Sequence, residues 1–289
     1  MATSPSHRFG QIIGEVLEAA IIPLLADFAA KHGLYFDKKG PRPCRSGLKC
    51  SWTDLNKNSH DLDFVLERGG TPTKKGMPAA FIEVAWRSYT KHSRNKAQEI
   101  QGAIMPLAET YSANGPFKGA ILAGVFTAGA ITQLTSLGFT ILYFPYESVV
   151  GVFRKLGMDA AFDEQTADKD LARKVKAYKG LSVADKQRLP KELLAAHKQD
   201  IDKFIASLST AVSKQIDRII ILPLHGDYRE LATIEDAIRY IGEHGETAGK
   251  IFIRYEIQIR YNNGDNINGA FENKDTAIKF LKTFQPVVP

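Results

Sequence analysis

Apolar residues along the chain follow two spacings, one typical of helices and one typical of strands. They recur every three or four residues from about Arg8 to Lys31, which predicts an amphipathic helix that Gly33 can end. Segments 60–67 and 79–86 are the short apolar runs of buried strands, and the glycines between them predict an antiparallel hairpin. We therefore expect the N-terminal part to pack helices on a sheet.

The same patterns extend the predicted sheet towards residue 145. A helix from about residue 93 to 111 follows the second hairpin strand, with its apolar residues on one face. A strand at 118–126, a short helix at 131–137 and a strand at 139–144 come next. This order is typical of the α/β class, with a mixed central sheet flanked by helices.

The rest of the chain divides into two further parts. Residues 166–216 are polar and rich in lysine, and they predict a helical connector or arm whose longest helix begins at Pro190. Residues 217–289 predict a small α+β module of order β-α-β-β-α, which would serve recognition or dimerisation. Residues 1–165 then form the main domain, and no tandem repeat is evident in the sequence.

Composition excludes a disordered chain but names no function. The chain has 289 residues, of which 44% are hydrophobic and 24% are charged, as in ordinary globular proteins. Two cysteines support neither a zinc module nor a disulfide framework. No signal-peptide layout opens the sequence and no long uninterrupted apolar stretch follows, so we expect a cytoplasmic protein with no membrane partner.

Two carboxylates carry the strongest chemical signal. Glu83 stands alone in an apolar run, and burying a carboxylate costs several kcal/mol unless something binds it. Asp63 lies in the preceding predicted strand, next to Glu83 in the hairpin. The pair predicts a divalent metal site, although Asp63 at a solvated strand edge and Glu83 in an ion pair with Arg87 are the structural alternatives.

Basic residues flank these predicted strands, and the formal net charge is +6. Lys38, Lys39 and Arg42 crowd a loop before the hairpin, and Lys91 and Arg94 follow the Glu83 strand. Taken alone, such runs are most often solvated surface. Beside a metal site they predict contacts to phosphate groups.

With these acids in this order, the segment from about residue 8 to 145 resembles the PD-(D/E)XK nuclease superfamily, and type II restriction endonucleases are its most similar class. The resemblance implies that Asp63 and Glu83 are the two motif acids and hold Mg²⁺. It also implies an accessory acid on the leading helix, either Glu15 or Glu18. Both glutamates are equally ordinary for the polar face of an amphipathic helix.

The sequence departs from the motif at one position. Ala85 stands where the motif has lysine, two residues after the second acid. A cation from elsewhere must then reach the site, and Lys96 at the start of the following helix is the first candidate. Lys91 is the second, while Arg87 stays protonated and would be a poor base.

The resemblance implies a Mg²⁺-dependent endonuclease that cuts double-stranded DNA at specific sequences, acts as a homodimer and leaves 5′-phosphates. Lys38, Lys39, Arg42, Lys91 and Arg94 would then contact the DNA backbone. A DNA repair or junction nuclease on the same core is an alternative, because it needs the same acids. A catalytically inactive DNA-binding protein is another, motivated by Ala85. The absence of a phosphate-binding P-loop, a dinucleotide fingerprint and the zinc-protease and serine-hydrolase motifs disfavours the commonest other enzymes.

Overall fold

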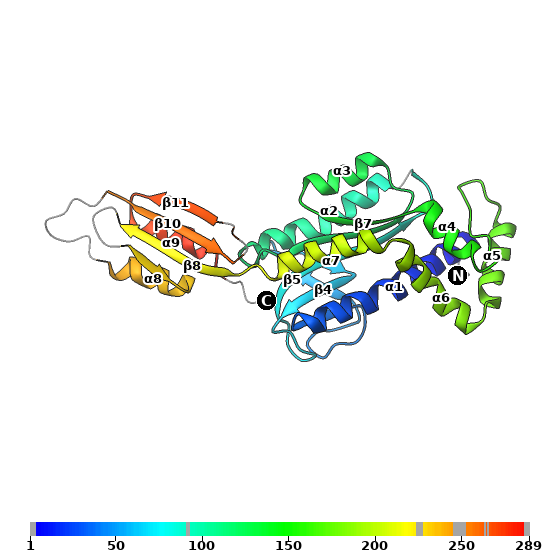
Figure 1. The fold of residues 1–289 in the computed structure, drawn as a ribbon, viewed down its shortest axis with the longest axis horizontal. Coiled ribbons are helices and arrows are strands. Elements are labelled where there is room, and N and C mark those ends of the chain that lie inside the picture. Colours follow the sequence, from blue (N-terminus) through cyan, green and yellow to red (C-terminus); the bar gives the residue numbers. More distant parts are fainter. Residues whose placement is uncertain are drawn as a thin grey trace.

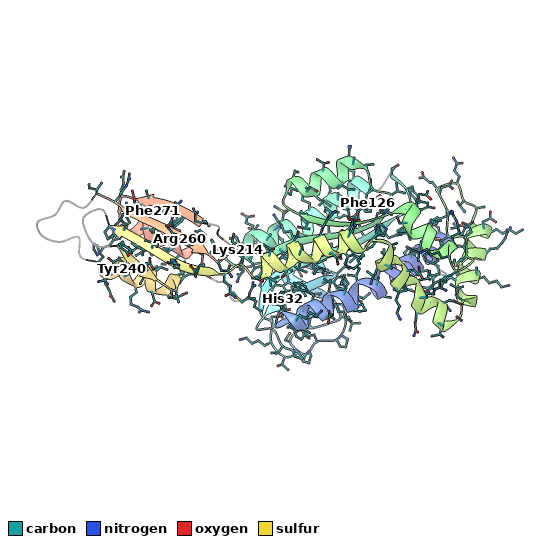
Figure 2. All side chains as sticks on the ribbon, in the orientation of Figure 1. His32, Phe126, Lys214, Tyr240, Arg260 and Phe271 are labelled. Atoms are coloured by element: carbon teal, nitrogen blue, oxygen red, sulfur yellow. The ribbon has the colours of Figure 1, made fainter. Side chains whose placement is uncertain are left out.

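The computed structural model describes residues 4–90, 93–223, 228–244, 253–262, 264 and 266–285. It shows an elongated molecule with a large α/β body and a small second body (Figure 1). Lys214 lies at the connection between the two, and side chains fill each body separately (Figure 2). None of the helices in the described ranges has the length and apolar character needed to cross a lipid bilayer.

A mixed five-stranded sheet forms the centre of the large body, as the sequence predicts. Its order is β1 (Leu34–Lys38), β4 (Phe64–Arg68), β5 (Met77–Arg87), β6 (Phe117–Gly124) and β7 (Thr140–Pro145). Strands β1, β4 and β5 pair antiparallel, whereas β5, β6 and β7 pair parallel. Strand β5 is therefore central, which explains its nearly continuous apolar sequence.

Helices cover both faces of this sheet. They are α1 (Pro5–Lys31) and α7 (Lys198–Val212) on one face, and α2 (Ser93–Thr110) and α3 (Ala128–Ser136) on the other (Figure 1). Side chains of β5 alternate between the two cores, so Ile82 packs on the α1 side and Phe81 and Ala85 on the α2 side. Glu83 follows the same alternation as Phe81 and Ala85.

The region predicted as a connector or arm is helical but lies against the large body. Helices α5 (Asp168–Gly180) and α6 (Val183–Ala196) pack against α1, and α4 (Tyr146–Arg154) packs against α6 (Figure 1). Leu171 and Leu193 are buried in the same core as α1. These sparse apolar positions are enough to hold a polar helix on the surface, because a narrow stripe suffices when only one side is covered.

Pro190 does not begin a helix, so that prediction is wrong. It lies inside α6, which starts at Val183. Ser182 caps this helix by accepting a hydrogen bond from the amide of Asp185 at 3.0 Å. The serine cap, rather than the proline, therefore sets the start of the helix.

A short hairpin precedes β4. It pairs β2 (Cys50–Thr53) with β3 (Ser59–Leu62), and its buried Trp52 packs edge-on against Phe81 of β5 at 5.7 Å between ring centroids. The chain bends once at Asp63 and continues directly as β4. This bend fixes where the first predicted acid enters the sheet.

The small body has the order β-β-α-β-β-α, one strand more than predicted. Its elements are β8 (Ile216–Pro223), β9 (Arg229–Leu231), α8 (Ile234–Glu243), β10 (Tyr255–Tyr261), β11 (Asn266–Phe271) and α9 (Lys274–Lys282). The antiparallel sheet has the order β11-β10-β8-β9, and the buried side chains of both helices share one core with it. This core is separate from those of the large body.

The small body consists of two halves with the same order of elements, although no tandem repeat is evident in the sequence. Each half is a hairpin followed by a helix, and β8 pairs with β10 at the centre. Pairing of Ile219 with Ile259 and of Ile221 with Ile257 gives the sheet an approximate two-fold arrangement. The two helices place equivalent residues in the core: Ala237 and Ala277, Ile241 and Leu281.

Candidate metal and nucleic-acid site

The hairpin of the central sheet brings Asp63 and Glu83 together. Phe64 of β4 lies opposite Ile82 of β5, so the preceding Asp63 lies opposite Glu83. The amide of Asp63 donates a hydrogen bond to Oε1 of Glu83 at 3.2 Å. In return, Oδ2 of Asp63 accepts one from the amide of Val84 at 2.8 Å. The two acids that the sequence singles out therefore occupy one site.

Burial makes this pair of acids difficult to ionise. Glu83 is only 7% exposed, and burial together with the charge of Asp63 raises the pKa of Glu83 to about 8. Burial also raises the pKa of Asp63, although the amide of Val84 and the charge of Lys96 oppose that rise. The pair thus favours a proton or another cation between its oxygens at neutral pH.

The donor atoms of this pair suit Mg²⁺. Carboxylate oxygens are hard ligands, and Mg²⁺ is usually held by one or two protein carboxylates while waters and substrate phosphates complete its shell. Within the ranges that the structure describes, no group of three or more His, Cys, Asp or Glu side chains is placed to hold a metal. Asp63 and Glu83 therefore fit a shared ion that is completed by substrate.

The positive charge of Lys96 acts on both acids. It lies in the first turn of α2, and its charge opposes the rise in the pKa of both Asp63 and Glu83. Its Nζ lies 3.2 Å from Oε2 of Glu99. Ala85 is 3% exposed and packs in the α2-side core, so the strand itself offers no cation here. Lys91, the other candidate, lies outside the described residues.

Arg87 lies farther from the acids. Arg87 follows Glu83 by four residues in β5, and at about 3.3 Å per residue their Cα atoms lie roughly 13 Å apart. Its Nη2 lies 3.8 Å from Oε2 of Glu99, and its Nη1 donates to the carbonyl of Trp86 at 2.8 Å. The contacts of the described residues include no ion pair between Arg87 and Glu83. Arg94 is exposed on the first turn of α2.

The two candidate accessory acids on α1 have different surroundings. Burial raises the pKa of Glu18, the nearby charge of Asp63 raises it further, and Lys39 opposes the rise. Glu15 instead forms an ion pair with Arg8 at 3.0 Å. Glu18 is therefore the acid of this helix that faces the pair, and Lys39 lies beside it.

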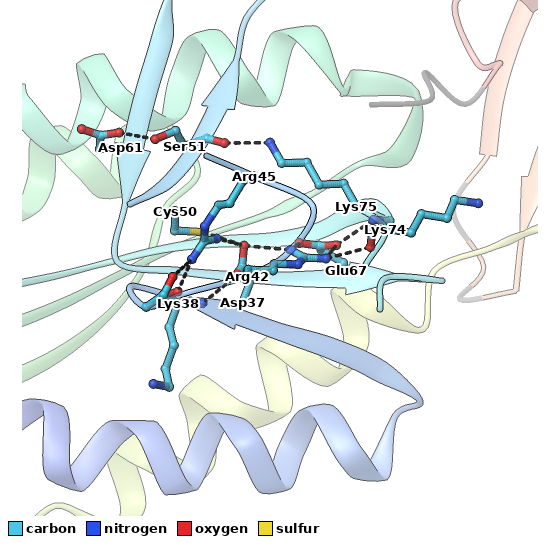
Figure 3. A network of polar contacts seen from close by, with 12 residues as sticks. Asp37, Lys38, Arg42, Arg45, Cys50, Ser51, Asp61, Glu67, Lys74 and Lys75 are labelled. Carbon is cyan, nitrogen blue, oxygen red and sulfur yellow. Dashed lines mark hydrogen bonds and ion pairs between the residues drawn. The ribbon is translucent and has the colours of Figure 1, made fainter. Parts of the chain in front are cut away.

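Arg42 is not available to DNA, so its predicted role is wrong. Its side chain is 2% exposed and donates to both carboxylate oxygens of Glu67, at 2.5 and 2.9 Å (Figure 3). It also donates to Asp37 at 2.8 Å. Lys38 and Lys39 in the same segment are exposed. The spacing of basic residues along the sequence does not reveal which of them is buried.

Sequence reasoning missed the acids of this buried network. Asp37 lies in β1, which was not predicted, and Glu67 is completely buried in β4. Glu67 also accepts a hydrogen bond from the amide of Gly76 at 2.7 Å. The network fastens the loop after β1 to the sheet edge, which positions Lys38 and Lys39 near the acid pair.

Comparisons with known proteins add no functional information. No protein-family model matches the chain, and no curated protein matches it. Among solved structures, the crystal structure of AF1548, a protein of unknown function, is similar over 65% of this chain and 98% of its own. The identity is 12% and the TM-score is 0.26, so this similarity supports no argument about fold or function.

Proposed function

We propose that the protein is a Mg²⁺-dependent endonuclease of the restriction type, which cuts double-stranded DNA at specific sequences on a PD-(D/E)XK-like core. The observation that carries this proposal is the pair Asp63 and Glu83 with Lys96 beside it. Two hard carboxylates can hold Mg²⁺, and an ammonium group beside them can stabilise charge that develops on a phosphate. The pairing of Asp63 with Glu83 across the hairpin supports the proposal.

In this proposal each residue has one task. Asp63 and Glu83 would hold Mg²⁺, which supplies neutralisation of the phosphate and activation of water when it is bound. The ammonium group of Lys96 would lie against the scissile phosphate and stabilise the charge that develops there. A water oxygen would bond to phosphorus while that water loses one proton to solvent, the bond to the 3′ oxygen would break, and the 3′ oxygen would take a proton from solvent, which leaves a 5′-phosphate.

The distribution of charge supports a polyanionic substrate on the large body. The excess of basic over acidic residues falls in residues 1–212, whereas residues 213–289 hold nearly equal numbers of each. Lys38, Lys39 and Arg94 are exposed on this body. Nonspecific affinity for duplex DNA comes from such contacts. The small body would then serve recognition or dimerisation, and a homodimer would present one site to each strand.

Ala85 favours one further candidate, a DNA-binding protein that has lost catalysis. This candidate requires that Lys96 fail to replace the motif lysine. A repair or junction nuclease would use the same acids, and substrate preference separates it from the restriction type. Cutting of flaps or junctions without regard to sequence would support repair.

The first test incubates the purified protein with plasmid and phage DNA, in Mg²⁺ and separately in EDTA. We expect discrete metal-dependent fragments from the wild type and intact DNA from Glu83→Ala. A Glu83→Ala variant that cleaves as fast as the wild type would remove the catalytic assignment. Binding without cleavage on all substrates would favour the inactive DNA-binding protein.

A further inference from the structure

A polar cleft lies at the carboxyl end of β5, beyond Glu83 on the same strand. It has a volume of about 430 Å³ and lies between the first turn of α1, the end of β5 and the first two turns of α2. Its lining includes the polar side chains of Ser6, Arg87, Asn95 and Glu99. Strands β5, β6 and β7 are parallel, and ligands of such sheets bind at the carboxyl ends of the strands.

A continuous set of charged side chains joins the cleft to the acids. The charge of Lys96 acts on Asp63 and Glu83, and Lys96 pairs with Glu99 at 3.2 Å. Glu99 in turn lies 3.8 Å from Arg87. Glu99 therefore connects Lys96, which acts on the acids, to Arg87 in the cleft. A DNA strand bound over the acids would continue into this cleft.

The cleft is suited to an anion. Arg87 is 31% exposed, and Glu99, its ion-pair partner among the described residues, also pairs with Lys96. Asn95 and Ser6 add neutral donors. The first turn of α1 carries no acidic residue, so its partial positive charge is not neutralised by a side chain of that turn.

We propose that this cleft binds a backbone phosphate of the strand that is cut, within a few nucleotides of the scissile phosphate, through Arg87, Asn95 and Ser6. Trp86 forms a firm wall behind Arg87 because it stacks on Tyr146 with ring centroids 6.0 Å apart. The cleft then aligns the strand so that the next phosphates lie over Asp63 and Glu83. This inference rests on the proposed function for its substrate.

The test measures binding without cleavage. A fluorescently labelled duplex of mixed sequence is titrated with the full-length protein in EDTA at several salt concentrations, since phosphate contacts do not depend on sequence. Arg87→Ala should weaken binding about tenfold, because a hydrogen bond to a charged group is lost. The slope of log affinity against log salt should fall by about 0.9. Arg188→Ala, which removes an exposed arginine paired with Glu192 on α6, is the matched control.

A second pair of variants separates binding from folding. Ser6→Asp places an acid in the first turn of α1, which stabilises a helix but repels a phosphate. It should therefore bind DNA more weakly than Ser6→Ala while melting at the same temperature or higher. Weakening of Ser6→Asp that is accompanied by a lower melting temperature would overturn this explanation.

The inference and the proposed function fail in different ways. Arg87→Ala that binds as the wild type does, or a wild type that does not bind the duplex at all, overturns the cleft assignment. Binding that depends on Arg87 and Ser6, together with no Mg²⁺-dependent cleavage by the wild type, supports the cleft while it removes the nuclease. Cleavage that depends on Glu83, together with unchanged DNA binding by Arg87→Ala, supports the nuclease and removes the cleft assignment.

Discussion

Asp63 and Glu83 are joined across the hairpin by two hydrogen bonds, although their carboxylates repel each other when ionised. The Asp63 amide donates to the Glu83 carboxylate, and the Asp63 carboxylate accepts from the amide after Glu83. These two hydrogen bonds hold the acids close together, although Glu83 is buried, Asp63 is partly buried and the two carboxylates repel when ionised. This repulsion lowers the stability of the metal-free protein, and a cation bound between the carboxylates would offset it.

Replacement of Glu83 should therefore stabilise the metal-free protein at high pH. The ordinary pKa of glutamate is 4.5 and that of Glu83 in the fold is about 8, so between these values the folded state keeps a proton that the unfolded state has lost. The free energy of unfolding then falls as pH rises through this window. Glu83→Gln avoids that loss, and we expect a gain of about 1–3 kcal/mol at pH 9 and almost none at pH 5.

Thermal melts in EDTA at the two pH values measure this difference. Glu109→Gln is the matched control, because Glu109 is an exposed glutamate on α2. An equal stability gain for Glu83→Gln at both pH values would contradict the proton assignment. Added Mg²⁺ should raise the melting temperature of the wild type at pH 9 and leave that of Glu83→Gln nearly unchanged.

The two glutamates of α1 provide an internal comparison of the accessory role. Glu18→Gln should weaken the apparent affinity for Mg²⁺ in cleavage roughly tenfold, because it removes an acid that faces Asp63. Glu15→Gln should change it by less than about twofold, since Glu15 pairs with Arg8 on the surface. Cleavage rates measured over a range of Mg²⁺ concentrations decide between them. Equal effects of the two variants would remove Glu18 from the site.

Local pattern alone predicts the acid pair and most of the sheet. Glu83 is conspicuous because its neighbours are apolar, and Asp63 follows from the alternation of side chains in a hairpin. The side of β5 on which Glu83 lies follows from Phe81 and Ala85. These inferences succeed because they need only residues close together in sequence.

The features that the sequence analysis missed depend on distant partners. Arg42 looks like a surface cation until Glu67, 25 residues later, is brought against it by the pairing of β1 with β4. The repeat in the small body is hidden for a related reason. Its halves match in chemical class, as Ile241 and Leu281 do, and become evident once the strand pairing is known.

Loss of Glu67 should destabilise the protein far more than loss of a surface acid. Glu67 is completely buried and accepts two hydrogen bonds from Arg42, so Glu67→Gln leaves a buried guanidinium without its main partner. Removing one member of a buried pair costs about 3–5 kcal/mol. Asp27→Asn breaks the exposed pair with Lys31 and should cost less than about 1 kcal/mol. Urea denaturation measures both, and similar costs would contradict the structural role of Arg42.

In the proposed function, Lys96 is the residue on which cleavage should depend most, because Ala85 stands at the motif position for lysine. Lys96→Ala removes the ammonium group that acts on both acids, and we expect single-turnover cleavage at saturating Mg²⁺ to slow at least about 100-fold. Lys96→Arg keeps the charge but not the compact geometry of an ammonium group, so it should recover only part of the rate. Lys169→Ala, at an exposed lysine of α5, should cleave as the wild type does.

Binding measurements separate a catalytic effect of Lys96 from a loss of DNA. The affinity of Lys96→Ala for a duplex in EDTA should change by less than about tenfold, because one phosphate contact at most is removed. A slow variant with nearly normal binding supports the assignment to the reacting phosphate. Wild-type rates from Lys96→Ala would show that the replacement for the motif lysine lies elsewhere, and Lys91→Ala would then be the next variant to measure.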